Sequence, residues 1–287
     1  MSQQPPDQAW TQVTSKRRRA APKPVPAAVP PRAADLRPAS ALAADHARLR
    51  ARWEDEEPCS RGLRALVAAN TGPGVVISRA INLGVGTFDP VDGAWEAKRS
   101  SQVQLIAFLV VVEELGSSAP ALLVWYHDAD GVIAEKITGS KIDCIFQDPI
   151  FTQPDKDFLA GLGHRVVEDP EACDMVNADS LLFGIHLYRP VYAEALEKSL
   201  PAIFVGTGWD VWDHIGHTDG LGKMETMEKT YKKCAFPQDS HGSAFSSTSI
   251  YWKPVPKAAA EAPGPEPKDS SEVEDDMSRK LESTSIS

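Results

Sequence analysis

Cysteine is scarce in this 287-residue chain, which has four cysteines and no Cys-x-x-Cys pair. They stand far apart, at Cys59, Cys144, Cys173 and Cys234. This spacing fits neither a zinc module nor a disulfide framework, and it is typical of proteins from a reducing compartment. The N-terminus also lacks the apolar segment of a signal peptide. We therefore expect an intracellular protein.

Long apolar runs and several catalytic motifs are missing as well. The longest apolar stretch, Leu105–Val112, is far shorter than the roughly 20 residues that cross a bilayer, so no membrane partner is expected. There is no Gly-x-Ser-x-Gly sequence, which excludes a nucleophile elbow. Gly222-Lys223 is followed by Met224, and His217 stands where a phosphate-binding loop has its first glycine.

Proline and charge are concentrated at the two ends of the chain. Residues 1–38 and 254–287 hold 13 of the 23 prolines. The first segment carries a net charge of +5 and the second −4, which leaves −11 between them out of the total of −10. Ends of this composition bury too little apolar surface to offset the entropy of ordering. The acidic middle is not expected to bind nucleic acid, because phosphate recognition requires a basic face.

This distribution predicts four segments. Residues 1–39 form a disordered basic arm rich in proline and alanine, and residues 40–78 form a helical N-terminal extension. Residues 79–253 form an α/β domain, followed by a disordered acidic tail at 254–287. The basic run Lys16–Arg19 in the arm is interpreted as a solubilising run; a nuclear address or a nucleic-acid-binding tail is the alternative. Localisation is therefore expected in the cytoplasm, and also in the nucleus if the run is an address.

Short apolar runs alternate with amphipathic segments along the domain. We expect strands at Ala80–Val85, Ala121–Tyr126 (alternatively a hairpin turning at Asp130-Gly131), Ile142–Phe146, His164–Val167, Ser180–Ile185, Pro201–Val205 and, as an edge strand, Thr248–Trp252. We expect helices from a Ser40 cap to Glu57, from a Ser60 cap through Val67, from a Ser101/Gln104 capping box to Leu115, and at Pro154–Leu162, Val191–Leu200 and Lys223–Lys233. This alternation predicts an open, mostly parallel, Rossmann-like sheet between two helical layers.

Four expected strands end in residues suited to a ligand site. They are Gly84 and Gly86, then Asp148, then His186, and then Gly206 with Thr207. Ligands of open parallel sheets bind beyond the carboxyl ends of the strands, so we expect a small-molecule site at this edge. Each residue taken alone also fits an ordinary turn, cap or buried histidine, and that alternative stays open.

The identity of a cofactor stays open too. Gly84-x-Gly86 followed by an acid outlines a dinucleotide or S-adenosylmethionine site, but Asp89 replaces the third glycine and the next helix is expected late. His214-x-x-His217 is a weak metal candidate, and a solvated loop is the favoured interpretation, so no metal is predicted. A haem would find axial ligands only among residues such as His186, His164 and Cys173.

The order of these motifs resembles the eukaryotic Sensitivity to Red Light Reduced family. The matching segments are Leu83-Gly84-Val85-Gly86, the helix start with Ser100, Gln102, Gln104 and Leu105, Asp148-Pro149-Ile150-Phe151-Thr152, Leu162-Gly163, Leu181–His186, Val205-Gly206, and Trp10-Thr11-x-Val13 before the basic run. The resemblance adds Gln102 to the candidate ligand-binding residues. This sequence departs from the family pattern at Gly184-Ile185, Leu187 and Thr207, where the family has Met-Pro, Cys and Asn.

The resemblance implies a regulatory protein without an established reaction. Family members are linked to circadian and light signalling or to haem metabolism, and the protein partners here are unknown. We therefore expect a regulatory domain that binds a small ligand at the carboxyl edge of its sheet. The alternative is a Rossmann-like enzyme, such as an S-adenosylmethionine-dependent methyltransferase that uses Gly84, Gly86 and Asp148.

Overall fold

The computed structural model describes residues 36–71, 75–118, 122–128, 131–137 and 142–254. The basic run Lys16–Arg19 and the acidic tail from residue 255 lie outside these ranges, and the division into four segments stays a prediction. No helix in the described ranges is both long and apolar enough to cross a membrane.

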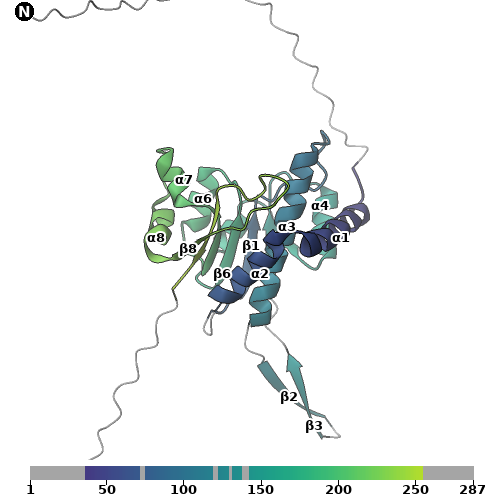
Figure 1. Cartoon of the computed structure of the whole chain (residues 1–287). Coiled ribbons are helices and arrows are strands. Elements are labelled where there is room, and N and C mark those ends of the chain that lie inside the picture. The colour runs from purple at the N-terminus through teal and green to yellow at the C-terminus, as the bar shows by residue number, and fades with distance from the viewer. Residues whose placement is uncertain (1–35, 72–74, 119–121, 129–130, 138–141, 255–287) are drawn as a thin grey trace, which may run out of the picture. The chain divides into compact units, whose positions relative to one another are not determined.

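Seven strands form one sheet in the order β5-β4-β1-β6-β7-β9-β8 (Figure 1). Their bounds are β1 Arg79–Leu83, β4 Asp143–Gln147, β5 Arg165–Val166, β6 Ser180–Gly184, β7 Ile203–Thr207, β8 Lys232–Ala235 and β9 Thr248–Trp252. The strands from β5 to β7 pair in parallel, whereas β9 is antiparallel to both β7 and β8. The predicted open, mostly parallel sheet is confirmed.

The position of β9 differs from the prediction. It lies between β7 and β8 and is not an edge strand. The predicted helix Lys223–Lys233 ends at Thr230, and the residues after it form β8, which covers the outer side of β9. All five residues of β9 are buried as a result. Local sequence pattern did not reveal that one more strand follows the helix.

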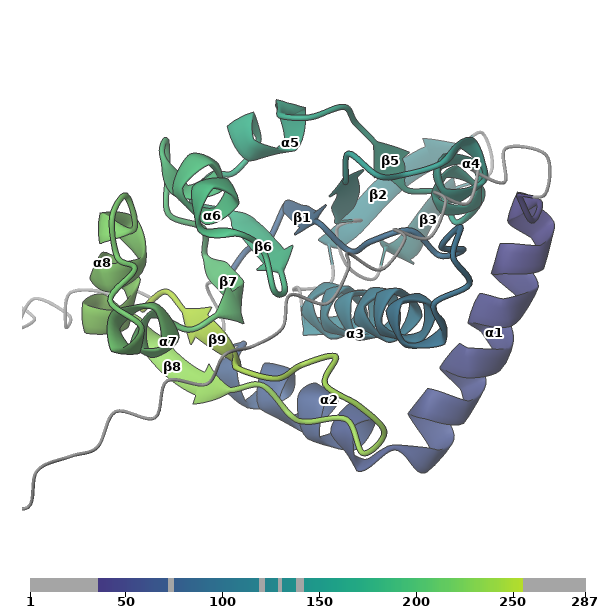
Figure 2. The ribbon, with the colours of Figure 1, turned by 90° about the horizontal axis from the view of Figure 1, so that it is seen from above.

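Eight helices are assigned within the described ranges, and they cover both faces of the sheet (Figure 2). Their bounds are α1 Ala39–Glu56, α2 Pro58–Asn70, α3 Trp95–Ser118, α4 Gln153–Gly161, α5 Glu171–Asp174, α6 Arg189–Leu196, α7 Trp209–His214 and α8 Gly222–Thr230. One buried cluster contains residues of the helices α1, α2, α3 and α4 together with Ala80, Phe146 and Phe183 of the sheet. A second cluster joins α5, α6 and α8 with Ile81, Leu182 and Phe204.

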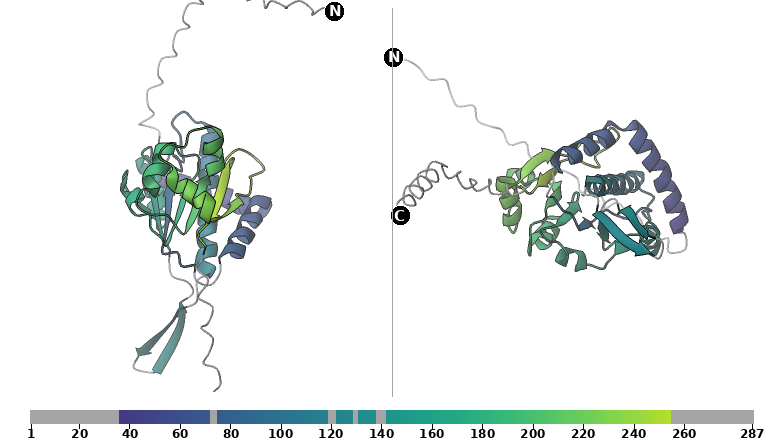
Figure 3. Two further views of the ribbon diagram at one scale, coloured as in Figure 1. Left: turned by 90° about the vertical axis from the view of Figure 1, so that its left-hand side faces the viewer. Right: turned by 90° about the horizontal axis from the view of Figure 1, so that it is seen from below.

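These alternating sheet residues explain the three layers. Neighbours along a strand point to opposite faces, so Ala80 enters one cluster and Ile81 the other. Both faces are apolar, which is why the strands read as continuous apolar runs and not as alternating ones. Figure 3 shows α1 and α2 beside α3 from two further directions.

The helix starts are where sequence pattern was least accurate. α1 begins at Ala39 after Pro38, so Ser40 is not its cap, and α2 begins at Pro58 instead of after Ser60. The predicted capping box at Ser101 is wrong, because α3 already begins at Trp95. Ser101 instead donates to the Ala97 carbonyl, and Gln104 donates to the Ala244 carbonyl. Both polar side chains are buried, and these hydrogen bonds, one within α3 and one to the loop before β9, give each of them a partner.

The segment after α3 is the predicted insertion hairpin. β2 (Leu122–Asp128) and β3 (Gly131–Ile137) pair antiparallel as a separate two-stranded sheet. The hairpin alternative is therefore confirmed over a single strand, although turn residue Asp130 lies outside the described residues.

Asp45 on α1 forms ion pairs that connect this helix with α3 and with the residue Arg37 before it. Its carboxylate accepts from Arg37 at 2.5 Å and from Lys98 of α3 at 3.0 Å, and it also pairs with Arg48. The hydrogen bond from Arg37 is the largest cause that lowers the pKa of Asp45, to about 2. The carboxylate is thus ionised throughout the physiological range.

We predict that Asp45→Asn lowers the free energy of unfolding by about 1–2 kcal/mol at pH 7. Because the folded-state pKa lies below the ordinary value of 3.8, the contribution is present above pH 4 and is lost as the pH falls through about 2. Urea unfolding of both proteins at a series of pH values measures the difference. A difference that stays constant down to pH 2 would contradict the assignment.

Candidate functional site

The predicted edge residues follow adjacent strands. β1 pairs with β4 on one side and with β6 on the other, and β6 pairs with β7. Gly84 and Gly86 therefore lie beside Asp148, and the Gly86 amide donates to Asp148 Oδ2 at 2.7 Å. Both glycines have positive φ values, +67° and +85°, which residues with a side chain rarely adopt.

Asp148 is half-buried and holds two loops together. Its Oδ1 accepts from the Ile150 amide at 3.0 Å, while its Oδ2 accepts from Gly86. Burial raises the pKa of Asp148, and this effect exceeds the lowering by the two backbone amides. Asp148 is thus a carboxyl group with increased proton affinity at the carboxyl edge of the sheet.

His186 is exposed and has a left-handed backbone, with φ of 57°. Its Nε2 lies 2.8 Å from the Ser246 carbonyl and 3.2 Å from the Ser246 hydroxyl. A carbonyl only accepts, so Nε2 is the ring nitrogen that donates to Ser246. The left-handed backbone of a non-glycine residue costs about 1–2 kcal/mol.

Gly206 and Thr207 lie inside β7 and serve the packing of the sheet. The buried Tyr192 hydroxyl donates to the Gly184 carbonyl at 2.6 Å and accepts from the Thr207 amide at 2.9 Å. A Cβ on Gly206 would lie 2.7 Å from the Gly184 oxygen and 2.9 Å from the Tyr192 oxygen. Burial raises the pKa of Tyr192, which therefore stays a neutral phenol.

Leu187 closes part of the edge. Its side chain occupies the space that a Cβ would need at Gly84 and at Gly184. This is one of the positions where the chain departs from the family pattern. Leu187 thus places an apolar group over the ends of β1 and β6, where a nucleotide-binding sheet has open space for its ligand.

Asp155 shapes the loop between β1 and α3, a role that the sequence pattern did not predict. Its carboxylate is fully buried and accepts from Thr87 Oγ1, the Phe88 amide and Thr152 Oγ1 at 2.8, 3.0 and 2.8 Å. With Thr152 it also forms the capping box of α4. The Thr152-x-x-Asp155 spacing is typical of a capping box and could have predicted this helix start. The contact between Asp155 and Thr87 has no such local pattern.

Gln102 does not join the edge residues. It is buried in α3, and its Oε1 lies 3.0 Å from Nδ1 of His46 on α1. Its Nε2 has no hydrogen-bond partner in the described part of the chain. A buried donor without a partner costs about 1–3 kcal/mol, which makes Gln102 a distinct feature of the α1–α3 interface.

The weak metal candidates His214 and His217 are exposed, at the end of α7 and just after it. Among the described residues, a different group of ligand atoms lies close enough for a metal: Glu57, Asp239 and His241. Arg99 Nη2 is 2.7 Å from Asp239 Oδ2, and His241 Nδ1 is 2.6 Å from Glu57. The Arg99 guanidinium already supplies the positive charge beside Asp239. We therefore interpret Glu57, Asp239 and His241 as part of an ionic contact that holds this loop in place.

The residues considered for haem do not fit that role together. Cys173 belongs to the core on the α5–α6 side, whereas the His164 ring packs 5.4 Å from Phe146 in the opposite core. Burial raises the pKa of Cys173 to about 11, so its thiol is neutral and a poor iron ligand. His186 would be left without a second axial ligand from this set.

An open parallel sheet with glycines, a carboxyl group and a histidine at its carboxyl edge defines a Rossmann-like domain. The family model for the SRR1 domain matches residues 63–252, more than half of the chain. The chain belongs to the SRR1 domain family, as the motifs predicted. The match begins within α2, so part of the predicted helical extension lies inside the family region.

Similarity beyond the family is weak. A crystal structure of a Corynebacterium glutamicum protein from a structural genomics consortium matches with 14% identity and a TM-score of 0.38. The match covers 76% of this chain and 92% of that one. No curated protein matches the chain.

We predict that Gly206→Ala lowers the free energy of unfolding by about 1–3 kcal/mol, because the new methyl group collides with Gly184 and Tyr192. Gly161→Ala in α4 is the control, since a Cβ there meets no described residue within 4 Å and alanine favours helix. Chemical denaturation compares the two. Equal stability of both variants would show that the β6–β7 contact tolerates a side chain.

We predict that Asp155→Ala lowers the free energy of unfolding by about 3 kcal/mol, because four donors from Thr87, Phe88 and Thr152 lose a buried, charged acceptor. Asp157→Ala, on the exposed side of the same helix, is expected to change it by less than about 0.5 kcal/mol. Urea unfolding measures both. A loss no larger than that of the control would remove Asp155 from this role.

Proposed function

We propose that this SRR1 domain protein is a regulatory protein that binds a small ligand at the carboxyl edge of its sheet. The observation that carries the proposal is His186, an exposed histidine with a left-handed backbone at the end of the central strand β6. Backbone strain of this kind concentrates at functional sites. Nε2 is held by Ser246, so Nδ1 is the atom offered to a ligand.

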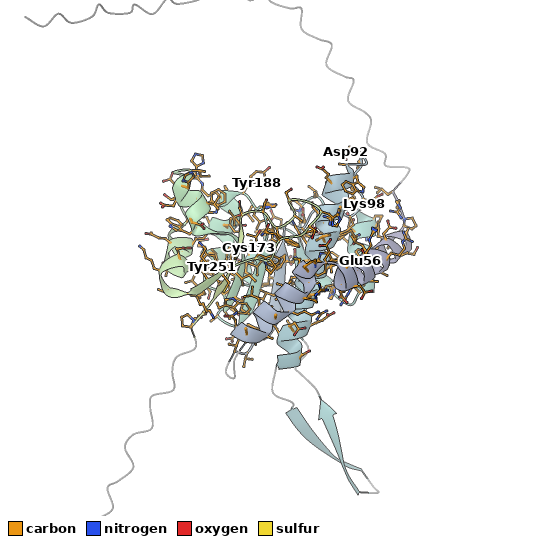
Figure 4. The ribbon with its side chains drawn as sticks, viewed as in Figure 1. Glu56, Asp92, Lys98, Cys173, Tyr188 and Tyr251 are labelled. Carbon is orange, nitrogen blue, oxygen red and sulfur yellow. The ribbon has the colours of Figure 1, made fainter. Side chains whose placement is uncertain are left out.

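The surroundings of His186 supply further ligand contacts. The half-buried backbone of Gly84 and Gly86 lies beside it, with Leu187 over Gly84 and the Ser101 hydroxyl 2.7 Å from where a Cβ of Gly86 would lie. Tyr188 and Ile150 are 83% and 59% exposed, and they follow His186 and Asp148 in sequence. Figure 4 shows Tyr188 at the same end of the molecule as Asp92 of the β1–α3 loop. A ligand with an apolar part and a hydrogen-bonding group matches this combination.

The regulatory setting comes from the family resemblance. It implies a role in circadian and light signalling or in haem metabolism, exercised through protein partners in the cytoplasm or the nucleus. The separation of Cys173 from His164 favours signalling over direct haem ligation.

The alternative is a methyltransferase that uses S-adenosylmethionine. The Gly84-x-Gly86 sequence and the Asp148 carboxyl group favour it. Two features weigh against it: α3 begins only at Trp95, too far from Gly86 for the usual glycine-loop junction, and Leu187 lies over Gly84. We therefore place the regulatory proposal first.

Thermal-shift measurements with S-adenosylmethionine, nicotinamide nucleotides and haem as probes test the ligand site. We expect a saturable shift with a probe that binds there, and its loss in His186→Gly. This variant relieves the backbone strain, so its free energy of unfolding should stay within about 1 kcal/mol of the parent. His214→Ala, at an exposed histidine on α7, is the control and should keep the shift.

Two results would overturn parts of the proposal. No shift with any of these probes would argue against a ligand site of this type. Release of S-adenosylhomocysteine during incubation with S-adenosylmethionine would replace the regulatory proposal with the methyltransferase.

A further inference from the structure

A separate cavity lies between α1 and the first two turns of α3. Its volume is about 490 Å³, within the range of roughly 300–1,000 Å³ that is usual for small-molecule sites. The lining residues are Asp45, Arg48, Leu49 and Arg52 of α1 and Trp95, Lys98, Arg99 and Gln102 of α3. The residues from α3 recur every three or four positions, so they share the helix face that contacts α1.

This cavity is distinct from the carboxyl edge of the sheet. Ser101, the neighbour of Gln102, lies under Gly86, where a Cβ would come within 2.7 Å of its hydroxyl oxygen. The edge residues therefore meet one side of α3 and the cavity lies on another. Binding of a ligand in the cavity can therefore be tested separately from binding of a ligand at the edge of the sheet.

The lining is positively charged in an otherwise acidic protein. Four cationic side chains and one carboxylate line it, although the whole chain carries a net charge of −10, and one of the four, Arg99, pairs with Asp239 outside the lining. Asp45 is occupied by Arg37, Arg48 and Lys98. Within the described part of the chain, the ion pair given for Arg52 is a long one with Glu56, 3.8 Å between well-exposed groups. The guanidinium of Arg52 thus retains most of its capacity to bind an anion.

Gln102 adds an independent sign of a ligand. The side chain is 2% exposed and lines the cavity, and its Nε2 has no partner among the described residues. Oε1 is held by His46, which fixes the amide in place. Nε2 itself has almost no accessible surface, so a ligand oxygen in the cavity accepts from it only once the lining side chains shift, and that contact would then remove the cost of a buried, unpaired donor.

Trp95 provides an aromatic surface next to these charges. It is 66% exposed in the first turn of α3, and it also lines a smaller cavity of about 110 Å³ with Arg99 and Ser100. An indole that remains this exposed suits the stacking of a planar ring. The N-terminal end of α3 also carries the positive end of the helix dipole.

We propose that this cavity binds a nucleoside phosphate. The base stacks on Trp95, the phosphate lies against Arg52 and Arg48, and an oxygen of the ligand accepts from Gln102 Nε2. Each of these three contacts corresponds to one part of a nucleotide: an aromatic ring, an anion and a neutral acceptor. Figure 4 shows Lys98, one of the lining cations, near the start of α3.

Isothermal titration of the full chain with AMP, ADP and ATP, and separately with adenosine and pyrophosphate, tests the proposal. We expect a nucleotide to bind more tightly than either adenosine or pyrophosphate alone. Trp95→Ala and Arg52→Gln should each raise its Kd about tenfold, as is usual for the loss of a stacking or phosphate contact. Gln102→Met should also raise the Kd, because it removes the donor and keeps the side-chain length.

Arg61→Gln is the matched control, because Arg61 is an exposed arginine of α2 outside the cavity lining. It should leave the Kd unchanged. Arg52 and Trp95 are exposed, so their variants keep the test informative even if Gln102→Met does not fold. Absence of binding by all three nucleotides would overturn the proposal, as would a Kd that neither Trp95→Ala nor Arg52→Gln changes. Pyrophosphate binding as tightly as ADP, unaffected by Trp95→Ala, would overturn the nucleoside part.

Discussion

The parallel pairing of β1 with both β4 and β6 is the constraint on which the rest of this structure depends. It brings the residues after three strands to one edge, although Gly86 and Asp148 alone are 62 positions apart in the chain. The bond from the Gly86 amide to Asp148 is a direct result. Parallel neighbours end at the same edge of a sheet, so the pairing alone decides which loops meet there.

Once the loops meet, most of their polar groups are used to hold them in place. Asp148 connects the loops after β1 and β4, Asp155 fixes the loop before α3, and Tyr192 joins β6 to β7. These contacts leave the exposed side chains of His186 and Tyr188 as the part of the edge that faces outward. A rigid edge with a small outward-facing set is suited to recognition, which accords with the regulatory proposal.

Helix α3 divides the molecule into two functional neighbourhoods. Ser101 meets the sheet edge, while Lys98 and Gln102 face the cavity next to α1. A 24-residue helix with an almost wholly buried middle is a stiff element. Because both neighbourhoods rest on its first two turns, small displacements of this helix would reach the edge and the cavity together. The proposed ligand site at the edge and the proposed nucleotide site would therefore both depend on the position of this helix.

The sequence by itself determined the α/β class, the parallel sheet, most strand positions and the family, because apolar runs and turn residues are local properties. It also placed Gly84, Gly86, Asp148 and His186 at strand ends. It misplaced the start of α3, since Ser101 and Gln104 imitate a cap while their partners come from Ala97 and Ala244. Only the tertiary structure decided that β9 is covered by β8, that Leu187 lies over Gly84, and that Gln102 faces a cationic cavity. Those outcomes depend on contacts between residues distant in sequence, and no local pattern encodes them.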